Sequence, residues 1–145
     1  MSVTLSELTD TDNYIEYCEV LKQLTSINIE KISTESFIKH LELIKSNPLH
    51  KIFVAKSDNR IIGTVTILIE PKIIHNLSYV AHIEDVVVDQ TYRLGGIGKL
   101  LMEHVINYSK QFGCYKIILD CAESKVGFYE KLGFVLKEKQ MAFYI

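Results

Sequence analysis

Two adjacent carboxylates, Glu84 and Asp85, stand directly before the apolar run Val86–Val88 in the segment HIEDVVVD. The run has the composition of a fully buried strand, and burying an unpaired carboxylate costs roughly several kcal/mol unless a pKa shift neutralises the group. Alternation along a strand would also send the two side chains to opposite faces of a sheet. The pair therefore needs either a structural reason, such as a capped or ion-paired strand end, or a chemical one.

A second candidate site is the glycine-rich turn Arg93–Gly98, RLGGIG. Glycine tolerates positive φ and lets backbone N–H groups approach a ligand closely. The free N–H groups and the positive dipole end of a following helix attract an anion, to which Arg93 and Lys99 add positive charge. A pyrophosphate suits such a site, and a tight turn without a ligand is the alternative. The spacing RxxGxG in mid-chain is neither the Rossmann pattern nor a Walker A motif, so the two usual nucleotide-binding folds are not indicated.

Apolar periodicity indicates which elements position these residues. We expect strands over residues 3–8, 52–55, 61–69, 80–89 and 116–121, with one or two more within 134–145. We expect helices over residues 14–24, 33–47, 97–112 and 124–132. Ser57-Asp58-Asn59 predicts a hairpin, Thr9–Asp12 supplies helix caps, and Gly113 and Gly133 end helices. The order β-α-α-β-β-β-α-β-α-β describes an α/β sandwich on a mixed sheet.

The chain as a whole is that of an ordinary globular protein. Its 145 residues fit one domain, 1–145, and a net charge of −2 gives no general attraction to nucleic acid or to an anionic membrane. No apolar run approaches the length of a bilayer span, and the acidic start MSVTLSELTDTDN has no signal-peptide pattern. Cys18, Cys114 and Cys121 show no metal-ligand spacing, so we expect reduced thiols, no metal and a cytoplasmic location.

With their flanking elements, these residues resemble the GNAT acetyltransferase superfamily. The pattern is RxxGxG between a strand and a helix, followed by another strand and FYEKLGF over 128–134, and the resemblance covers essentially the whole chain. The segments HIEDVVVD, GCYKIILDC, KIIH and LTS resemble, within that superfamily, the eukaryotic glucosamine 6-phosphate N-acetyltransferases. The resemblance implies a GNAT domain with a mixed, mostly antiparallel sheet that is splayed at its middle strands and flanked by helices. It also implies direct transfer of acetyl from acetyl-CoA to the amine of glucosamine 6-phosphate, a step toward UDP-N-acetylglucosamine.

The resemblance further implies the residues that hold acetyl-CoA. A β-bulge at the carboxylate pair would re-aim its side chains and open the strand pair, so that the pantetheine arm inserts beside Val86–Val88 as an added strand. Tyr129 matches the tyrosine that contacts the departing sulfur and supplies an acid, with plain core packing as the alternative. The implied coenzyme-binding residues are Val86, Val87, Val88, Arg93, Leu94, Gly95, Gly96, Ile97, Gly98, Lys99 and Tyr129.

For the sugar, Asp120 matches the residue that holds the amine, and Glu84 joins it and Tyr129 as the implied catalytic set. The implied substrate-binding residues are Thr25, Lys72, His75, Glu84, Asp85, Tyr115, Lys116 and Asp120. For each lysine and for His75, the alternative is a residue with no ligand. In this family a homodimer completes the pocket, so some of these residues are expected to act on the partner's substrate.

Three positions depart from the family pattern. Tyr144 stands where an arginine helps hold the phosphate, Lys125 where an asparagine contacts the coenzyme, and Leu94 where glycine is common. Cys121 beside Asp120 raises a ping-pong route, but a buried strand cysteine is usually inert. Two alternatives stay open: a GNAT enzyme for another small amine, and a catalytically silent acetyl-CoA-binding regulator.

Overall fold

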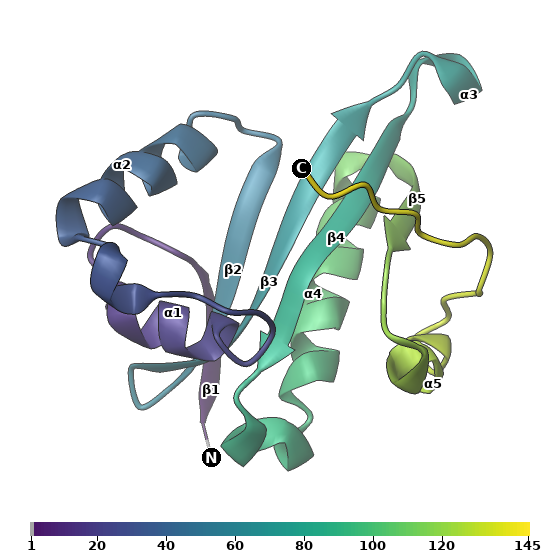
Figure 1. Ribbon diagram of the computed structural model, residues 1–145. Helices are drawn as coiled ribbons and strands as arrows, with labels where there is room; N and C mark the ends of the chain where they lie inside the picture. Colours follow the sequence, from purple (N-terminus) through teal and green to yellow (C-terminus); the bar gives the residue numbers. More distant parts are fainter. Residues whose placement is uncertain (1) are drawn as a thin grey trace.

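The computed structural model describes residues 2–145, without the side chain of Leu94, and arranges them around a five-stranded sheet in the order β1-β2-β3-β4-β5 (Figure 1). The strands are β1 (Val3–Glu7), β2 (His50–Ser57), β3 (Arg60–Pro71), β4 (Tyr79–Val88) and β5 (Cys114–Leu119). Neighbouring strands from β1 to β4 are antiparallel, whereas β4 and β5 are parallel. A parallel pair needs a crossover connection, which the helix between β4 and β5 provides.

Helices cover the two faces of this sheet unequally. The α-helices are α1 (Tyr14–Leu21), α2 (Thr34–Lys45), α3 (Ile74–Leu77), α4 (Ile97–Phe112) and α5 (Val126–Glu130), and the 3₁₀ helices are η1 (Ile29–Lys31), η2 (Gln90–Gly95) and η3 (Glu123–Lys125). Helix α4 packs on β2 to β5 from one side, while α1 and α2 lie on the other side, over the part of the sheet nearer β1 (Figure 1). On this second face, no helix of the described residues lies over β5 and the adjoining part of β4 (Figure 1).

Local sequence explains where the helices begin and end. The side chain of Asn13 accepts hydrogen bonds from the first turn of α1, and Ser33 and Ser36 form a reciprocal capping box at α2. The caps expected at Thr9–Asp12 instead close a turn before α1, where Asp12 accepts from the backbone N–H of Thr9. Gly113, at φ 90°, ends α4 as predicted, because a left-handed residue after a helix favours glycine.

Two apolar clusters hold the sheet between its layers. The cluster under α4 centres on Val65, Ile67, Leu101, Met102 and Val105, all fully buried. The cluster under α1 and α2 centres on Leu8, Tyr17, Leu41, Val54 and Ile61. The middle of β3 is therefore covered on both faces, which explains its nearly continuous run of apolar and threonine residues.

One sequence prediction about the elements is wrong, and one short element was not predicted. Within the described residues no strand follows β5, and 135–145 is an irregular, exposed segment, here called the C-terminal segment. This segment pairs with no described strand although the outer edge of β5 is free, so the alternating pattern alone does not make a strand. The other difference is α3, at the tip between β3 and β4, where His75, Asn76 and Leu77 all have left-handed φ.

Across residues 2–145, none of the helices has the length and apolar character that a membrane span requires.

Candidate active site

The two adjacent carboxylates lie on a β-bulge. Thr66 of β3 pairs with Glu84 and Thr64 with Val87, so two residues of β4 stand opposite the single Val65. Asp85, the first of these two, has φ 50°, a left-handed conformation that is uncommon for any residue but glycine. Both carboxylate side chains are exposed. The bulge implied by the family resemblance is confirmed.

The apolar run after the bulge is less buried than its composition predicts. Val87 is buried against α1, but Val86 and Val88 are only half-buried. The reason is the geometry of β5, which pairs with β4 no further than Ile83 opposite Leu119. Beyond this point β4 continues to Val88 with a neighbour on one side only. The expectation of a fully buried strand end is therefore wrong, and the expected splay of the two strands is confirmed.

The glycine turn has the open helix terminus that an anion needs. Gly96, at φ 72°, precedes α4, and no side chain among the described residues caps this helix. A Cβ built on Gly96 would meet no protein atom within 4 Å, so the space beside this backbone is free. Arg93 donates from Nε to the carbonyl of Val88 at 3.1 Å, which holds its side chain at the same end of β4.

Gly98 serves a different purpose from Gly96. A Cβ there would lie 3.3 Å from Cζ of Phe128, so the missing side chain lets α5 pack against the first turn of α4. Phe128 was not among the predicted site residues, although it belongs to the FYEKLGF segment. The side chain of Leu94 lies outside the described residues.

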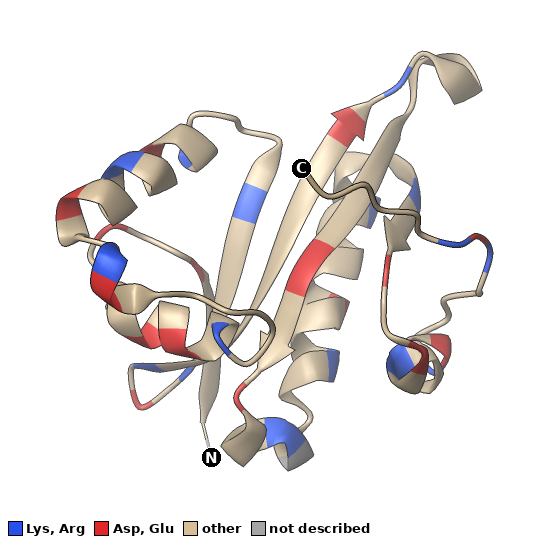
Figure 2. Ribbon diagram, in the orientation of Figure 1, with Lys and Arg blue, Asp and Glu red and all other residues tan. Residues whose placement is uncertain are grey.

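The carboxylates of β4 meet a third one from β5. Burial raises the pKa of the Glu84 carboxyl, and the negative charges of Asp120 and Asp85 raise it further, while His82 opposes the shift. Asp120 directly follows β5, so the splay brings it toward Glu84. Acidic residues colour the lower part of β4 and the chain just beyond β5 in Figure 2. The structure thus brings together two of the three residues expected to be catalytic.

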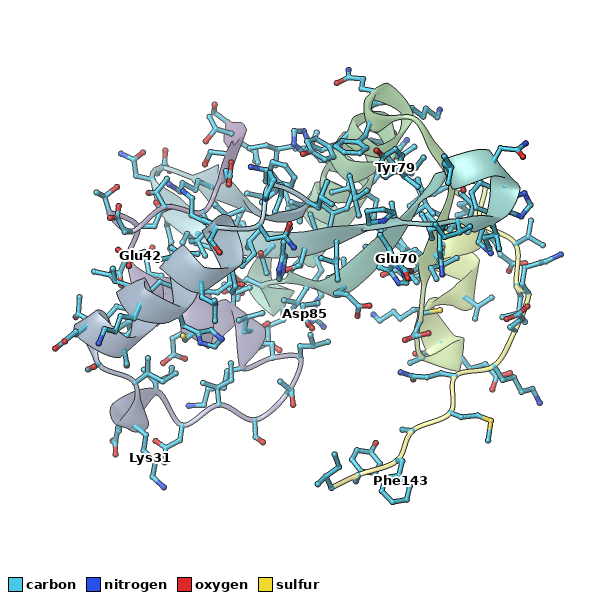
Figure 3. The ribbon with its side chains drawn as sticks, turned by 90° about the horizontal axis from the view of Figure 1, so that it is seen from above. Lys31, Glu42, Glu70, Tyr79, Asp85 and Phe143 are labelled. Carbon is cyan, nitrogen blue, oxygen red and sulfur yellow. The ribbon has the colours of Figure 1, made fainter. Side chains whose placement is uncertain are left out.

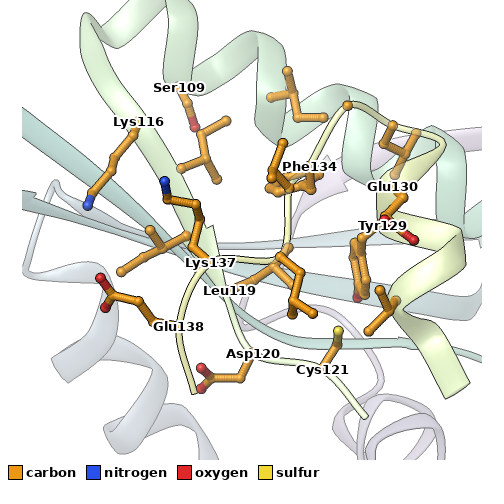
Figure 4. A pocket seen from close by; sticks show the side chains of 18 of the residues that line it. Ser109, Lys116, Leu119, Asp120, Cys121, Tyr129, Glu130, Phe134, Lys137 and Glu138 are labelled. Atoms are coloured by element: carbon orange, nitrogen blue, oxygen red, sulfur yellow. The ribbon is translucent and has the colours of Figure 1, made fainter. Parts of the chain in front are cut away.

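Tyr129, the third, lies on α5 in the wall of a hollow of about 730 Å³ that Asp120 and Cys121 also line. Figure 4 shows Cys121 between Asp120 and Tyr129 on this wall. The Tyr129 side chain is buried, and burial, with a smaller effect of Cys121, raises the pKa of its hydroxyl. The hydroxyl therefore keeps its proton at neutral pH, as an acid must. Cys121 follows the end of β5 and is exposed, so the expectation of a buried strand cysteine is wrong.

Predicted phosphate-binding residues form a second cluster near the first residues of β4 and β5, here called the His75 cluster: Lys72, His75, Tyr115 and Lys116. The ring of His75 packs on Tyr115 with centroids 4.1 Å apart, and the Lys116 Nζ lies 5.5 Å from the Tyr115 ring centroid. Lys72 is at the same tip, but its Nζ is 3.2 Å from a carboxylate oxygen of Glu70. The ammonium of Lys72 is thus partly neutralised, which its sequence context did not indicate.

The two clusters are separated along the sheet. Tyr115 and Asp120 are five residues apart, and at about 3.3 Å a residue they lie roughly 16 Å from each other. The hollow that Asp120 lines also includes Tyr115 and Lys116, whereas Lys72 and His75 are not among its lining residues.

Thr25 lies on the exposed loop after α1, and this loop is tied to the end of β4. The side-chain oxygen of Gln23 accepts a hydrogen bond from the backbone N–H of Gln90 at 2.9 Å. Two residues that depart from the family pattern lie elsewhere. Tyr144 is 91% exposed on the C-terminal segment, and Lys125 is the residue before α5. Sequence reasoning missed Gln23, because a lone polar loop residue gives no signal of its contacts.

A splayed parallel strand pair, a glycine-led helix start without a side-chain cap and neighbouring carboxylates thus lie together at one edge of an α/β sandwich. The chain belongs to the Acetyltransferase (GNAT) family, whose model matches residues 16–134. It is 46% identical over 91 residues to a glucosamine 6-phosphate N-acetyltransferase of Trypanosoma brucei brucei, a match that spans 63% of this chain and 62% of that protein. It is 38% identical over 140 residues to glucosamine 6-phosphate N-acetyltransferase 1 of Dictyostelium discoideum, covering 94% of this chain and 87% of the relative. The crystal structure of the glucosamine-6-phosphate N-acetyltransferase from Arabidopsis thaliana superposes with a TM-score of 0.94 at 35% identity, covering 99% of both chains.

Proposed function

We propose that this chain transfers the acetyl group of acetyl-CoA to the amine of glucosamine 6-phosphate. The observation that carries the proposal is the position of Glu84 facing Asp120 at the mouth of the splay between β4 and β5. An acceptor amine needs anionic groups beside a thioester, and this arrangement supplies them. The names of the relatives, which match this chain over most of its length, identify the acceptor.

The residues around the splay fit the coenzyme. The free edge of β4 from Glu84 to Val88 can pair with an extended chain such as pantetheine, as an added strand would. The uncapped N–H groups of α4 and the open space beside Gly96 suit a pyrophosphate. Acetyl-CoA is the cosubstrate, and it supplies the acetyl thioester.

The chemistry asked of the protein is positioning and proton transfer. Glu84 accepts a proton from the ammonium form of the substrate, and Asp120 holds the amine toward the thioester. As the N–C bond forms and the C–S bond breaks, the Tyr129 hydroxyl gives its proton to the sulfur. The nitrogen then loses its second proton, which returns the tyrosinate to the neutral phenol, so that the products are the amide and CoA thiol. The pKa of Glu84, raised by burial and by its acidic neighbours, brings this base closer to the pKa of an amine.

The phosphate points to a homodimer. Seven bonds of roughly 1.5 Å separate the amine nitrogen and the phosphorus of the substrate, so the two lie within about 10 Å. The His75–Tyr115 pair is roughly 16 Å along the sheet from Asp120, and Lys72 and His75 lie outside the hollow that Asp120 lines. We therefore propose that Lys116, Lys72 and His75 of one protomer serve the substrate held by Glu84 of its partner.

The exposed C-terminal segment supports this assembly. Met141, Phe143 and Tyr144 are each more than 90% exposed, and Figure 3 shows Phe143 standing well away from the sheet. Apolar side chains so exposed on a monomer mark a surface that another chain covers. β5 is an edge strand in this sheet, so its outer side is also open to pairing.

The first test of this function is release of CoA thiol from acetyl-CoA with glucosamine 6-phosphate, glucosamine, spermidine and lysine as acceptors. Charged hydrogen bonds to the phosphate are worth roughly 1.5–3 kcal/mol each, so kcat/KM should favour glucosamine 6-phosphate over glucosamine by at least about tenfold. Lys116→Ala should reduce this preference and leave activity on glucosamine nearly unchanged. Equal turnover of both sugars by the wild type would refute the substrate assignment.

The second test asks whether the site is shared. Tyr129→Phe and Lys116→Ala, each weakly active alone, are mixed, dissociated and reassociated. In a composite site, one of the two pockets of the mixed dimer has both intact residues, so activity on glucosamine 6-phosphate should rise well above the mean of the parents. No rise in a mixture shown by sedimentation to contain dimers would place the whole site in one chain.

A further inference from the structure

His82 lies on the same sheet face as α1 and α2, in the part over β4 and β5 that these helices leave uncovered. Its strand neighbours there are Leu68 of β3 and Ile118 of β5, which are 36% and 39% exposed. Toward one end of this face lie Glu84 and Asp120, and toward the other lies Glu70. The imidazole thus stands between two groups of carboxylates.

Glu70 fixes the ring of His82. One carboxylate oxygen of Glu70 lies 2.9 Å from Nε2 of His82 and 3.2 Å from Nζ of Lys72. The bond to His82 is the main cause that lowers the pKa of Glu70, with Lys72 second, so Glu70 is an anion at neutral pH. A carboxylate partner of this kind sets the orientation of an imidazole ring.

The other end of the face concentrates negative charge. Glu84 is two residues from His82 on the same side of β4, a separation of roughly 6.6 Å along the strand. Burial and the negative charges of Asp120 and Asp85 raise the pKa of Glu84, so a nearby cation favours its ionised form, which can accept a proton. Charged and titratable groups reach this face from every element around it. They are Glu70 and Lys72 from the β3 end, His82, Glu84 and Asp85 from β4, Lys116 from β5 with Asp120 directly after it, Tyr17 from α1, and Lys137, Glu138 and Lys139 from the C-terminal segment. Burial raises the pKa of Tyr17 to about 12, so its hydroxyl adds no charge.

We propose that His82, held by Glu70, is a positioning residue whose imidazolium keeps the carboxylate of Glu84 charged and ready to accept the proton of the acceptor amine. This role rests on the proposed function, in which Glu84 is the base. Nothing in the sequence pattern singles out the pair, since His82 and Glu70 come from different strands and meet only through the β3–β4 register.

The pH dependence of kcat/KM tests the proposal. His82→Gln removes the cation but keeps a polar side chain on this half-exposed face. The interaction of partly exposed charges is worth about 0.2–1 kcal/mol, so we expect kcat/KM near pH 6 to fall up to about fivefold relative to the wild type. At alkaline pH, where carboxyl groups are fully ionised, the two values should converge. A loss of the same size at every pH would indicate a merely structural role and overturn the proposal.

Two further variants sharpen this test. His82→Lys keeps a cation at this position and should return the acidic limb of the profile to the wild-type pH or below. His40→Gln, on the exposed surface of α2, is the matched control and should leave the profile unchanged. Failure of His82→Lys to restore the limb, in a variant with wild-type thermal stability, would also overturn the proposal.

A measurement without turnover separates this proposal from the proposed function. The titration of the Glu84 carboxyl, followed by carbon NMR, should move to higher pH in His82→Gln and, to a smaller extent, in Glu70→Gln. An unmoved titration would refute the role of His82 even if the enzyme acetylates glucosamine 6-phosphate. If the Glu84 titration shifts in His82→Gln as expected but the wild type acetylates none of the amines, the proposed function is refuted and the His82–Glu84 coupling stands.

Discussion

The two halves of the sheet differ in how they are covered. The covered half, β1 to β3, lies between α4 on one face and α1 and α2 on the other, and Val54, Val65 and Ile67 in it are fully buried. The open half, β5 with the adjoining part of β4 up to Glu84, has α4 on one face only, and Glu84, Lys116 and Asp120 there are exposed. The covered half supplies stability, and the open half keeps charged groups and free strand edges where ligands can reach them. The following substitutions probe this division, from the largest expected effect to the smallest.

Tyr129→Phe, a change beside the open half, should abolish most of the acetyltransferase activity without unfolding the protein. The variant loses only a hydroxyl, and loss of a positioned acid is typically worth about 10²–10⁴-fold in rate. We expect this fall in kcat for glucosamine 6-phosphate, with the thermal unfolding midpoint nearly unchanged. Tyr108→Phe, which alters a ring packed on Phe53 under α4, is the control and should keep the wild-type kcat. A kcat near wild type in Tyr129→Phe, with chemistry rate-limiting, would remove Tyr129 from the mechanism.

Leu101→Ala should lower the stability of the protein and leave its activity nearly unchanged. Leu101 is fully buried under α4, and removing such a side chain leaves a cavity that costs about 2–5 kcal/mol of unfolding free energy. Chemical denaturation measures this loss, and kcat of the folded variant should stay near wild type. Leu100→Ala, at a position 36% exposed on the same helix, should cost much less. Equal losses for the two variants would mean that burial under α4 does not set stability.

Gly96→Val should affect the coenzyme before the sugar. The left-handed backbone at φ 72° disfavours any side chain by about 1–2 kcal/mol, and the new side chain would project into the open space at the start of α4. The KM for acetyl-CoA should therefore rise far more than the KM for glucosamine 6-phosphate. Gly113→Val carries the same backbone strain at the other end of α4, at φ 90°, and should leave both KM values unchanged. If both variants alter the two KM values alike, the turn at Gly96 is only structural.

The smallest effect concerns a histidine of α4 packed against the covered half. Nε2 of His104 is buried without a hydrogen-bond partner among the described residues, and burial lowers the pKa of its imidazole. An unfolded chain takes up this proton near pH 6.5, whereas the folded protein does so only at lower pH. The contribution to stability is thus complete above pH 6.5 and is lost as pH falls below it. Unfolding midpoints measured from pH 8 to 5 should decline less steeply in His104→Leu, and parallel curves would contradict this.

The covered half was the more predictable from sequence, because its signals are local. The turn at Asp58-Asn59, the start of α2 after Ser33 and the end of α4 at Gly113 each follow from a residue whose conformational preference matches its place. Apolar periodicity is also reliable where both faces of an element meet the same chain. These elements therefore appear close to their predicted bounds.

The open half was less predictable, because its contacts depend on register or on groups outside the chain. The alternation in the C-terminal segment predicted a strand, yet a strand needs a partner. That Glu84 faces Asp120, and Glu70 contacts His82, follows from strand pairings that no local pattern specifies. The carboxylate pair at the head of an apolar run was a local signal that this position is unusual, but the bulge itself was implied by the family resemblance.

The crossover that makes β4 and β5 parallel also bears on the order in which the molecule folds. Strands β2, β3 and β4 are joined by short turns, whereas β5 reaches β4 only after the sixteen residues of α4 have formed and docked. Contacts between residues distant in sequence form later, since closing the longer loop costs more chain entropy. Pulse-labelled amide exchange during refolding should therefore protect β2 and β3 before β5. Simultaneous protection would contradict this order, in which a chain emerging from the ribosome gains its scaffold first and its coenzyme cleft last.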